Sequence, residues 1–365
     1  MNLFPSVQQA YTQDNMSARD AQRLAQYIAF GPIVFQASRL LVKFGILENL
    51  RDSTDGQTVE EAAKAADIST YAAKVLLEAG LSVGVVKVDT SNDHYHLSKT
   101  GWFLLNDPAT RVNMDFNHDV NYLGFFKLEE ALKEGRPAGL EVFGDWPTIY
   151  EALSSLPDQV KKSWFGFDHF YSDHSFDTAL GVVFSFKPGR ILDIGGNTGR
   201  WAMQCVGHDE NVIVTIADLP QQIGMMRAET AGKPGAERIE AWPVDMLKAE
   251  TTLPEGNDVI WMSQFLDCFS EEQISSILAK VASVMDAHTR ACIMETFWDR
   301  QKFEPAAFCL TMTSLYFTAM ANGNSKMYHS DDFIRLLDGA GLEIEDVHDG
   351  IGQGHSILVC RLKQK

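Results

Sequence analysis

The chain of 365 residues is longer than one hydrophobic core usually supports, so its length predicts two domains. Its composition is that of a folded protein, with 45% hydrophobic and 22% charged residues. The formal net charge of −18 disfavours nucleic acid and anionic lipid as partners, because both would be repelled over most of the surface. The five cysteines are scattered without a C-x-x-C pair, so we expect no metal site and no disulfide.

The amino-terminal segment, residues 1–112, is predicted to form a helical domain. Its first residues, MNLFPSVQQAYTQDN, lack the pattern of a signal peptide, and no stretch of the chain is apolar enough to span a membrane. We therefore expect a cytoplasmic protein without membrane contact. Residues 19–50 carry a wide apolar stripe at helical spacing, which suits either plain core helices or helices that also pack against a second chain.

Residues 57–105 have the pattern of a helix-turn-helix with a wing. An alanine-rich helix is followed by a turn at residues 67–69, a second helix that ends at Gly80, and two strands around residues 90–93. Such modules often bind DNA, but residues 57–100 contain four lysines and no arginine against six carboxylates. A structural or dimerising module is the better interpretation.

Residues 113–184 are predicted to be a helical connecting region that contributes to a substrate pocket. The segment is rich in aromatic and histidine residues, which at this density usually form core but can also line a pocket for a flat ligand. Its candidate substrate-binding residues are Trp146, His169 and Tyr171, to which the later Met312 is added.

Residues 185–365 show strands and helices in alternation, the pattern of a parallel sheet covered on both faces. We therefore predict an α/β fold with a doubly wound sheet. The tail adds a helix at 331–340 and the strands LEIEDVH and HSILVCRL. The earlier expected strands are 190–194, 211–217, 258–263 and 290–295, and the expected helices are 198–206, 219–230 and 271–286.

The glycine-rich stretch RILDIGGNTGR places Gly195, Gly196 and Gly199 between the first strand and its helix. Glycines there allow a tight turn and bring main-chain N–H groups close to a ligand. The dinucleotide pattern G-x-G-x-x-G is not met, because positions 197 and 200 are not glycine. Asp193 instead precedes the glycines, and its carboxylate suits a ligand with positive charge better than a pyrophosphate.

Two further acids follow the next strands. Asp218 in TIADLP can accept both hydroxyls of a ribose, or it can cap the helix that begins after Leu219. The third strand ends in VDM, where Asp245 can contact the amide edge of a base and Met246 its apolar face.

The motifs DIGGNTG, ADLP, VDM and SDHS, behind a helical and winged region, resemble the S-adenosylmethionine-dependent O-methyltransferases of the plant caffeic acid and bacterial polyketide type. The resemblance covers nearly the whole chain. It implies a Rossmann-like class I methyltransferase domain, a winged-helix dimerisation domain, a homodimer, S-adenosylmethionine as cofactor and a small-molecule acceptor. The implied contacts are Asp193, Gly195 and Gly196 for the methionine part, Asp218 for the ribose, and Asp245 and Met246 for adenine. Gly199, Leu219, Ser175 and the backbone near Ser263 are further implied contacts of the cofactor.

In this family the fourth strand runs into a segment of the form H-D-W-S-D-E, whose histidine takes the proton of the hydroxyl that is methylated. DCFSEE aligns with it without gaps and puts Asp267 in the place of the histidine. Glu295 keeps the family's acid after the fifth strand, whereas Met327 stands where a second supporting acid is expected.

An ordinary aspartate is a poor base for a phenol. With a carboxyl near pKa 3.9 and a phenol near 10, proton transfer is uphill by on the order of 8 kcal/mol, against about 5 for a histidine near 6.5. Repulsion and desolvation would raise one pKa if Asp267 and Glu295 meet in a dry pocket. The alternative is that Asp267 is only a solvated cap of the helix that begins near Ser270.

Our leading hypothesis is a transferase that methylates a small aromatic hydroxyl acceptor, with Asp267 as base and Glu295 in support. A second hypothesis keeps the cofactor but replaces methyl transfer by a hydroxylation or decarboxylation. A third is a winged-helix regulator that senses the cofactor.

Overall fold

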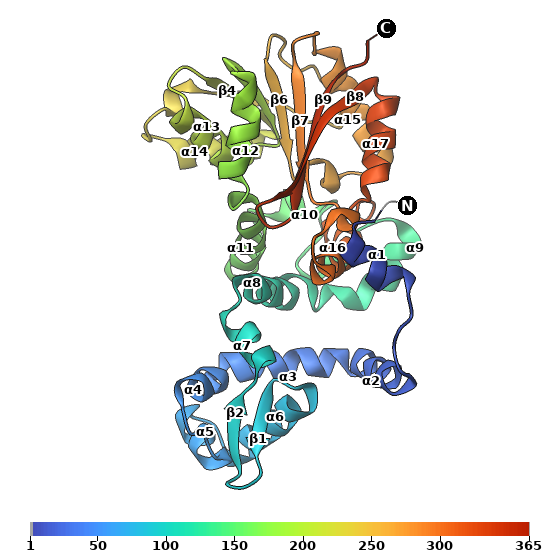
Figure 1. Ribbon diagram of the computed structural model, residues 1–365. Coiled ribbons are helices and arrows are strands. Elements are labelled where there is room, and N and C mark those ends of the chain that lie inside the picture. The colour runs from blue at the N-terminus through green and yellow to red at the C-terminus, as the bar shows by residue number, and fades with distance from the viewer. Residues whose placement is uncertain (1–2, 365) are drawn as a thin grey trace. The chain divides into compact units, whose positions relative to one another are not determined.

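A computed structural model describes residues 3–364, which divide into two compact units (Figure 1). One unit comprises Asp14–His118, and the rest of the described chain forms the other. Within the described residues we find no helix with the length and apolar character needed to cross a membrane.

The unit Asp14–His118 contains the predicted helix-turn-helix and wing. Its two strands pair antiparallel from Val86 opposite Leu97 to Asp89 opposite His94. The second helix continues to Val83 rather than ending at Gly80, because Gly84, with φ +80°, is the residue that ends it. The elements are α2 Ala18–Ala29, α3 Gly31–Lys43, α4 Ile46–Asp52, α5 Val59–Ala65, α6 Thr70–Val83, β1 Val86–Asp89, β2 His94–Leu97, α7 Lys99–Asn106 and α8 Pro108–Phe116.

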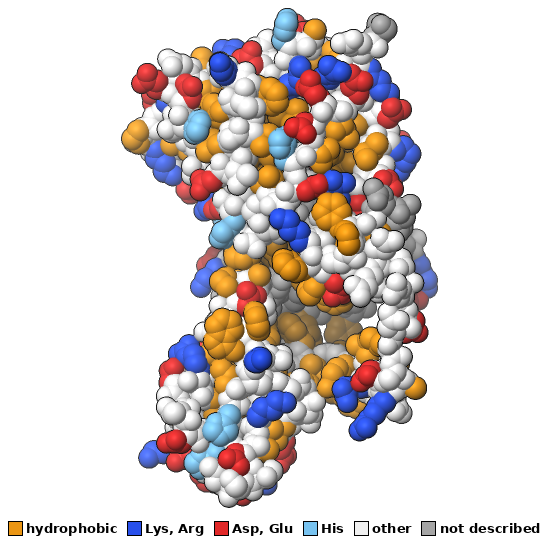
Figure 2. All heavy atoms as spheres, in the orientation of Figure 1, with side chains coloured by type: hydrophobic (Ala, Val, Ile, Leu, Met, Phe, Trp, Pro, Cys, Tyr) orange, Lys and Arg blue, Asp and Glu red, His pale blue; other side chains and the backbone are white. Residues whose placement is uncertain are grey.

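Helix α2 buries none of its residues. Its apolar side chains Leu24 and Ile28 are exposed to solvent, Ile28 over 72% of its surface. Ile33 on the following helix, α3, is 64% exposed. Figure 2 shows hydrophobic side chains at the surface of this unit among the charged ones. The apolar stripe predicted over residues 19–50 is therefore only partly used in the core of its own unit.

The other unit starts with α1 Pro5–Thr12 and continues with a series of short helices before the sheet. Trp164 ties two of its helices together, because its indole N–H donates to the hydroxyl of Tyr316 at 2.7 Å. These helices are α9 Leu128–Glu134, α10 Ile149–Ala152, α11 Asp158–Asp173 and α12 Phe176–Val183, with π-helical turns at Asn117–Asn121 and Phe317–Ala321 and 3-10 turns at Gly124–Lys127, Ala138–Val142 and Phe184–Phe186.

The sheet has seven strands in the order β5-β4-β3-β6-β7-β9-β8. The first five run parallel, but β9 pairs antiparallel with both β7 and β8. The expected parallel pairing is confirmed for the strands β3 to β7. The tail strands β8 and β9 add an antiparallel pair at one edge, because a tight turn joins them. The strands are β3 Arg190–Ile194, β4 Ile213–Asp218, β5 Ile239–Pro243, β6 Val259–Ser263, β7 Arg290–Glu295, β8 Leu342–Ile351 and β9 His355–Leu362.

Helices cover both faces of this sheet (Figure 1). Ile191 packs against the layer of α12, α13 and α14, whereas Leu192 and Ile194 pack against α15 and α17. The chain order reverses between β3 and β6, so the carboxyl ends of these strands form the crevice where such sheets bind ligands. The remaining helices are α13 Arg200–His208, α14 Pro220–Thr230, α15 Glu271–Ser283, α16 Glu304–Tyr316 and α17 Ser330–Gly339, with 3-10 turns at Ala236–Arg238, Leu266–Cys268 and Trp298–Arg300.

Candidate active site

The glycine loop at the end of β3 has no room for side chains. Gly195 has φ +78°, and a Cβ added there would lie 2.3 Å from a ring carbon of Phe265. A Cβ on Gly196 would lie 2.6 Å from Oδ2 of Asp193. Gly199 has φ +80° and is the N-cap of α13. The loop therefore presents backbone to the crevice, as the sequence predicts.

Asp193, which precedes the glycines near the end of β3, is deeply buried, with 2% of its surface exposed. Its Oδ2 has no hydrogen-bond partner among the described residues. Burial, and to a smaller extent the charge of Asp218, raises the pKa of the Asp193 carboxyl to about 8. An unpartnered buried carboxyl of this kind is best stabilised by a positively charged ligand group.

Asp218 ties the end of β4 to the glycine loop. Its Oδ2 accepts the backbone N–H of Asn197 at 2.9 Å, and its Oδ1 accepts that of Leu219 at 2.7 Å. Burial raises the pKa of Asp218 to about 6, although both hydrogen bonds oppose the shift. Leu219 is the N-cap of α14 and no side chain caps that helix, so the capping alternative for Asp218 is wrong. Carboxylate oxygens each accept more than one hydrogen bond, which leaves capacity for ribose hydroxyls.

Asp245 and Met246 lie just beyond β5, which ends at Pro243 rather than at VDM. Oδ1 of Asp245 accepts the N–H of Leu247 at 3.0 Å. Met246 is 5% exposed and packs in the core beneath the sheet, so only a small part of its side chain faces the crevice.

Ser175 belongs to a buried network. Its Oγ lies 3.0 Å from Nδ1 of His355, and Nε2 of that histidine lies 3.0 Å from Oε1 of Gln264. Gln264 has φ +47° and follows Ser263 at the end of β6. Burial lowers the pKa of His355 to about 4, so the ring is neutral. Ser175 thus supports the turn after Ser263 through His355.

Asp267 lies in the 3-10 turn Leu266–Cys268 and is 5% exposed. The Cys268 thiol donates to Oδ1 of Asp267 at 3.5 Å. Burial raises the pKa of Asp267 to about 6. Ser270 caps α15 in a capping box with Gln273, so the alternative in which Asp267 is a solvated cap is wrong.

Glu295 ends β7 and is 1% exposed. Its Oε1 accepts the N–H groups of Phe265 at 3.1 Å and Leu266 at 2.8 Å, whereas Oε2 has no hydrogen-bond partner among the described residues. Burial and then the charge of Asp267 raise the pKa of Glu295. Met327 is buried nearby, with its sulfur 3.4 Å from the hydroxyl of Thr296. The site therefore has a pair of acids, with an apolar residue in the place of a third.

Three polar residues near this pair were not predicted from the sequence. Asp168 on α11 has its pKa raised to about 7, first by burial and then by Asp267. Burial also raises the pKa of the Tyr150 and Tyr316 hydroxyls, both of which interact with Cys268. Asp168 follows Trp164 by one helical turn on a helix rich in aromatics, a spacing that could have indicated that it faces inward.

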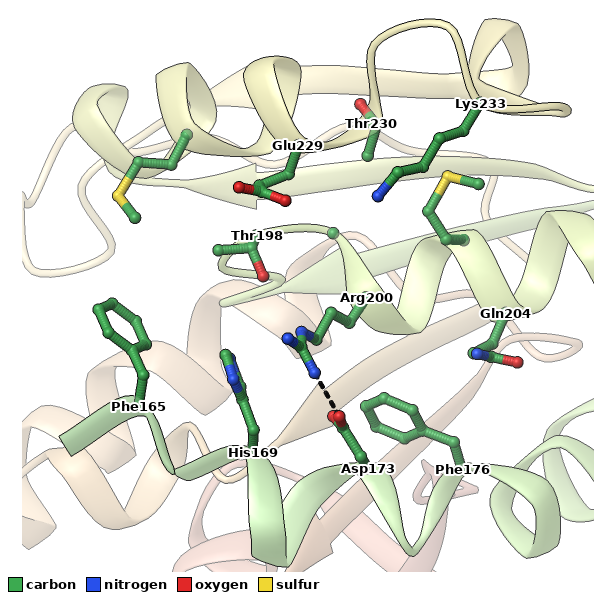
Figure 3. A pocket seen from close by; sticks show the side chains of 13 residues that line it. Phe165, His169, Asp173, Phe176, Thr198, Arg200, Gln204, Glu229, Thr230 and Lys233 are labelled. Atoms are coloured by element: carbon green, nitrogen blue, oxygen red, sulfur yellow. Dashed lines mark hydrogen bonds and ion pairs between the residues drawn. The ribbon is translucent and has the colours of Figure 1, made fainter. Parts of the chain in front are cut away.

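His169, one of the predicted substrate residues, lines a pocket of about 490 Å³ between α11, α13 and α14 (Figure 3). In this pocket Arg200 pairs with Asp173. The strand-end acids Asp193 and Asp267 do not line it, so we place the chemistry in the crevice instead. The lining residues are Phe165, His169, Asp173, Phe176, Thr198, Gly199, Arg200, Met203, Gln204, Met225, Glu229, Thr230 and Lys233.

The other predicted substrate residues are dispersed. The ring of Tyr171 lies 4.9 Å from that of Phe167. Trp146 packs against the backbone of Gly144, and Met312 is 46% exposed on α16. Among the described residues no group of three or more histidine, cysteine or acidic side chains is arranged to hold a metal ion.

Comparisons with known proteins match two domains in this chain. A Dimerisation2-like domain matches residues 22–95, and an O-methyltransferase domain matches residues 125–343. The 3-amino-4-hydroxybenzoate 4-O-methyltransferase of Streptomyces cremeus is 25% identical over 62% of this chain. The chain spans 59% of that relative's length. The mitomycin biosynthesis 6-O-methyltransferase of Streptomyces lavendulae is 22% identical over 93% of this chain and 95% of its own.

Solved structures share the fold. The S-adenosylmethionine-dependent methyltransferase SibL in its apo form has a TM-score of 0.70 at 22% identity, with 93% of this chain and 98% of that chain covered. An O-methyltransferase of neocarzinostatin biosynthesis, solved with S-adenosylmethionine and 2-hydroxy-5-methyl naphthoic acid, has a TM-score of 0.66 at 18% identity over 90% of this chain and 96% of its own.

Proposed function

The chain belongs to the O-methyltransferase family by its match over residues 125–343, and on this premise we propose that it transfers a methyl group from S-adenosylmethionine to a hydroxyl of a small aromatic acceptor. The observation that carries the proposal is the row of acids at adjacent strand ends. Asp218, Asp193, Asp267 and Glu295 follow or end β4, β3, β6 and β7 in the order of the strands across the sheet.

The residues at the end of β3 and β4 fit S-adenosylmethionine. The unpartnered carboxyl of Asp193 suits a ligand that bears positive charge, and the backbone of Gly195 and Gly196 allows close approach. The carboxylate of Asp218 can accept ribose hydroxyls while it holds Asn197. When bound, the cofactor supplies a methyl group already activated by its sulfonium, so the protein mainly has to align the acceptor.

Deprotonation of the acceptor is the task we assign to Asp267. As the acceptor oxygen takes the methyl group that bound S-adenosylmethionine would supply, the proton of the acceptor hydroxyl would pass to Asp267. With a pKa near 6 this carboxyl lies about four units below a phenol, on the order of 5 kcal/mol, close to the value for a histidine near 6.5. Burial thus removes most of the deficit that an ordinary aspartate would have.

Glu295 positions this base. Its Oε1 fixes the amides of Phe265 and Leu266, which lead directly into Asp267. Since burial and Asp267 both raise the pKa of Glu295, it carries the proton of the pair near neutral pH. Asp267 is then the ionised member of the pair.

We also infer a homodimer formed through the unit Asp14–His118. The match of residues 22–95 to a Dimerisation2-like domain supports it, as does α2, which buries no residue yet exposes Leu24 and Ile28. The alternatives of a hydroxylase or decarboxylase and of a cofactor-sensing regulator receive no support from the comparisons.

Calorimetry with S-adenosylmethionine and S-adenosylhomocysteine tests the cofactor, and incubation with a pool of phenols tests the transfer. We expect both compounds to bind and S-adenosylhomocysteine to accumulate together with an acceptor that is heavier by one methyl group. The proposal would be overturned if neither compound bound, or if S-adenosylhomocysteine accumulated without a methylated acceptor.

A further inference from the structure

Three carboxyl groups from separate elements share one desolvated region of the candidate site. Asp267 and Glu295 are 5% and 1% exposed. The Asp168 side chain keeps 28% of its surface accessible, yet burial is the main cause of its pKa of about 7. Asp168 is therefore the member of this acid group that a ligand can reach most easily.

This acid group lacks a neutralising cation. Among the described residues, no lysine or arginine forms an ion pair with Asp168, Asp267 or Glu295. Arg200 is close enough to lower the pKa of Asp168, but its guanidinium pairs with Asp173. His169 lies 4.0 Å from Asp168, and burial lowers the pKa of its imidazole, so it supplies no charge at neutral pH. Unpaired buried charge is costly, so the region favours a ligand that brings a cation.

An unpartnered polar atom independently indicates a missing ligand. Oε2 of Glu295, on a residue that is 1% exposed, has no hydrogen-bond partner among the described residues. Buried polar atoms are nearly always hydrogen-bonded, so this atom marks a place for a polar group of a ligand.

Aromatic side chains form the walls of the same region. Trp164 lies one helical turn before Asp168 and donates its N–H to Tyr316. The charge of Asp267 and that of Asp168 both act on the Tyr316 hydroxyl. A flat ring can therefore lie among apolar surfaces while acids face it from α11 and from the end of β6.

We propose that the acceptor is a phenol that also carries a basic amine, with its ammonium group held by Asp168 and its hydroxyl presented to Asp267. This inference rests on the proposed function and adds the substrate class. The same arrangement disfavours aromatic carboxylates, because a further negative charge would be placed beside the ionised Asp267 without a counter-ion.

Three phenols of matched size test the inference: tyramine, which bears an ammonium; tyrosol, which bears an alcohol; and para-hydroxyphenylacetate, which bears a carboxylate. We expect kcat/KM to fall at least tenfold from tyramine to tyrosol and again to para-hydroxyphenylacetate. Binding of each compound is measured in parallel by calorimetry with S-adenosylhomocysteine present, so that recognition is assayed without turnover.

Asp168→Asn should bring the ratio of kcat/KM for tyramine over tyrosol close to one, mainly through a higher KM for tyramine. The control Asp158→Asn changes a carboxyl of the same helix whose side chain is fully exposed, at 100%, and should keep the wild-type ratio. A merely structural role of Asp168 would lower the rates with all acceptors without changing the ratio.

The outcomes separate this inference from the proposed function. Methylation of tyrosol or para-hydroxyphenylacetate at a rate equal to that of tyramine would overturn the inference and leave methyl transfer intact. Preferred binding of tyramine without any S-adenosylhomocysteine from turnover would support the recognition of an amine and overturn the transfer. Equal binding of all three compounds would overturn the inference whatever the turnover.

Discussion

The carboxyl of Glu295 holds the turn that carries Asp267, and the charge of Asp267 in turn raises the pKa of Glu295. The first relation rests on two hydrogen bonds from the amides of Phe265 and Leu266 to one oxygen of Glu295. The second follows from the burial of both acids in one dry region. Two such carboxyls do not ionise independently, so they lose their protons in two coupled steps.

Replacement of Asp267 tests whether this acid is the base. Asp267→Asn should lower turnover by about 10²- to 10⁴-fold, the usual contribution of a general base, while the thermal shift caused by S-adenosylhomocysteine stays unchanged. Asp267→His should retain turnover within about tenfold. The pKa of a histidine, near 6.5, and that of this aspartate, near 6, differ from the pKa of a phenol by similar amounts. The matched control is Glu272→Gln, which removes an exposed acid of α15. Wild-type turnover of Asp267→Asn would exclude the role.

Replacement of Glu295 tests where the proton of the pair lies. Because the base must be ionised, kcat/KM of the wild type should rise with pH through about 6 and then level. Glu295→Gln mimics the protonated acid and still accepts both amides, so the rate should stay within a few-fold and the rise should remain near pH 6. Glu295→Ala leaves the amides of Phe265 and Leu266 without their acceptor and should cost about 1 to 3 kcal/mol of stability. A Gln variant as impaired as Asp267→Asn would show that Glu295 acts in its ionised form.

The sheet was predictable from the sequence where its strands are buried. Residues 190–194 and 290–295 coincide with β3 and β7, because central parallel strands are covered on both faces and read as continuous apolar runs. β5 gave no such run, since none of the residues in Ile239–Pro243 is buried. Only the position of its end was inferred, and that inference placed the end three residues beyond Pro243.

The site was predictable for motifs but not for contacts between distant segments. Asp193 and Asp218 follow from local spacing, whereas Asp267 interacts with Glu295 on β7 and Asp168 on α11, which no local pattern connects to it. The spacing of Asp168 from Trp164 indicates the inward face of α11 but not the contact with Asp267. One signal was present and overlooked: Ser270 followed three residues later by Gln273 is a capping box, which already assigns the cap of α15 to Ser270.

The glycine loop offers a contrast between two Gly→Ala changes. Gly196→Ala would place a Cβ 2.6 Å from the carboxyl of Asp193 and 2.8 Å from Ile216, so the loop must shift and cofactor affinity should fall at least tenfold. Gly207 lies in α13 with nothing within 4 Å of an added Cβ, so Gly207→Ala should leave affinity unchanged and stabilise the helix by about 0.5 to 1 kcal/mol. Calorimetric titration and thermal melts check both. Equal affinities of the two variants would contradict the tight loop.

The exposed apolar residues of the unit Asp14–His118 should hold two chains together. The double change Ile28→Glu and Ile33→Glu places charge on side chains that are 72% and 64% exposed here, and should convert the dimer to monomer in light scattering after gel filtration. The control is Gln22→Glu, at an exposed position of α2, the helix that carries Ile28. It adds a charge without removing an apolar side chain and should leave the dimer intact. A double variant that remains dimeric would place the interface elsewhere.

Asp193 should couple cofactor binding to pH. Its folded-state pKa of about 8 lies above the ordinary value of 3.8, so the folded chain without ligand binds a proton that the unfolded chain releases between these values. The contribution of Asp193 to the free energy of unfolding is therefore fully present below about pH 4 and is lost as pH rises to about 8.

A positively charged ligand reverses this preference, because it favours the ionised carboxyl. Its binding below pH 8 should release a proton, and its affinity should rise with pH up to about 8 and level above it. Calorimetry at pH 7 in two buffers of different ionisation enthalpy detects the release as a difference in heat. Asp193→Asn should abolish that difference, whereas Asp177→Asn, at an exposed acid in the first turn of α12, should preserve it. If the wild type binds with the same heat in both buffers, Asp193 does not release a proton on binding. The prediction that the ligand's positive charge ionises this carboxyl would then be wrong.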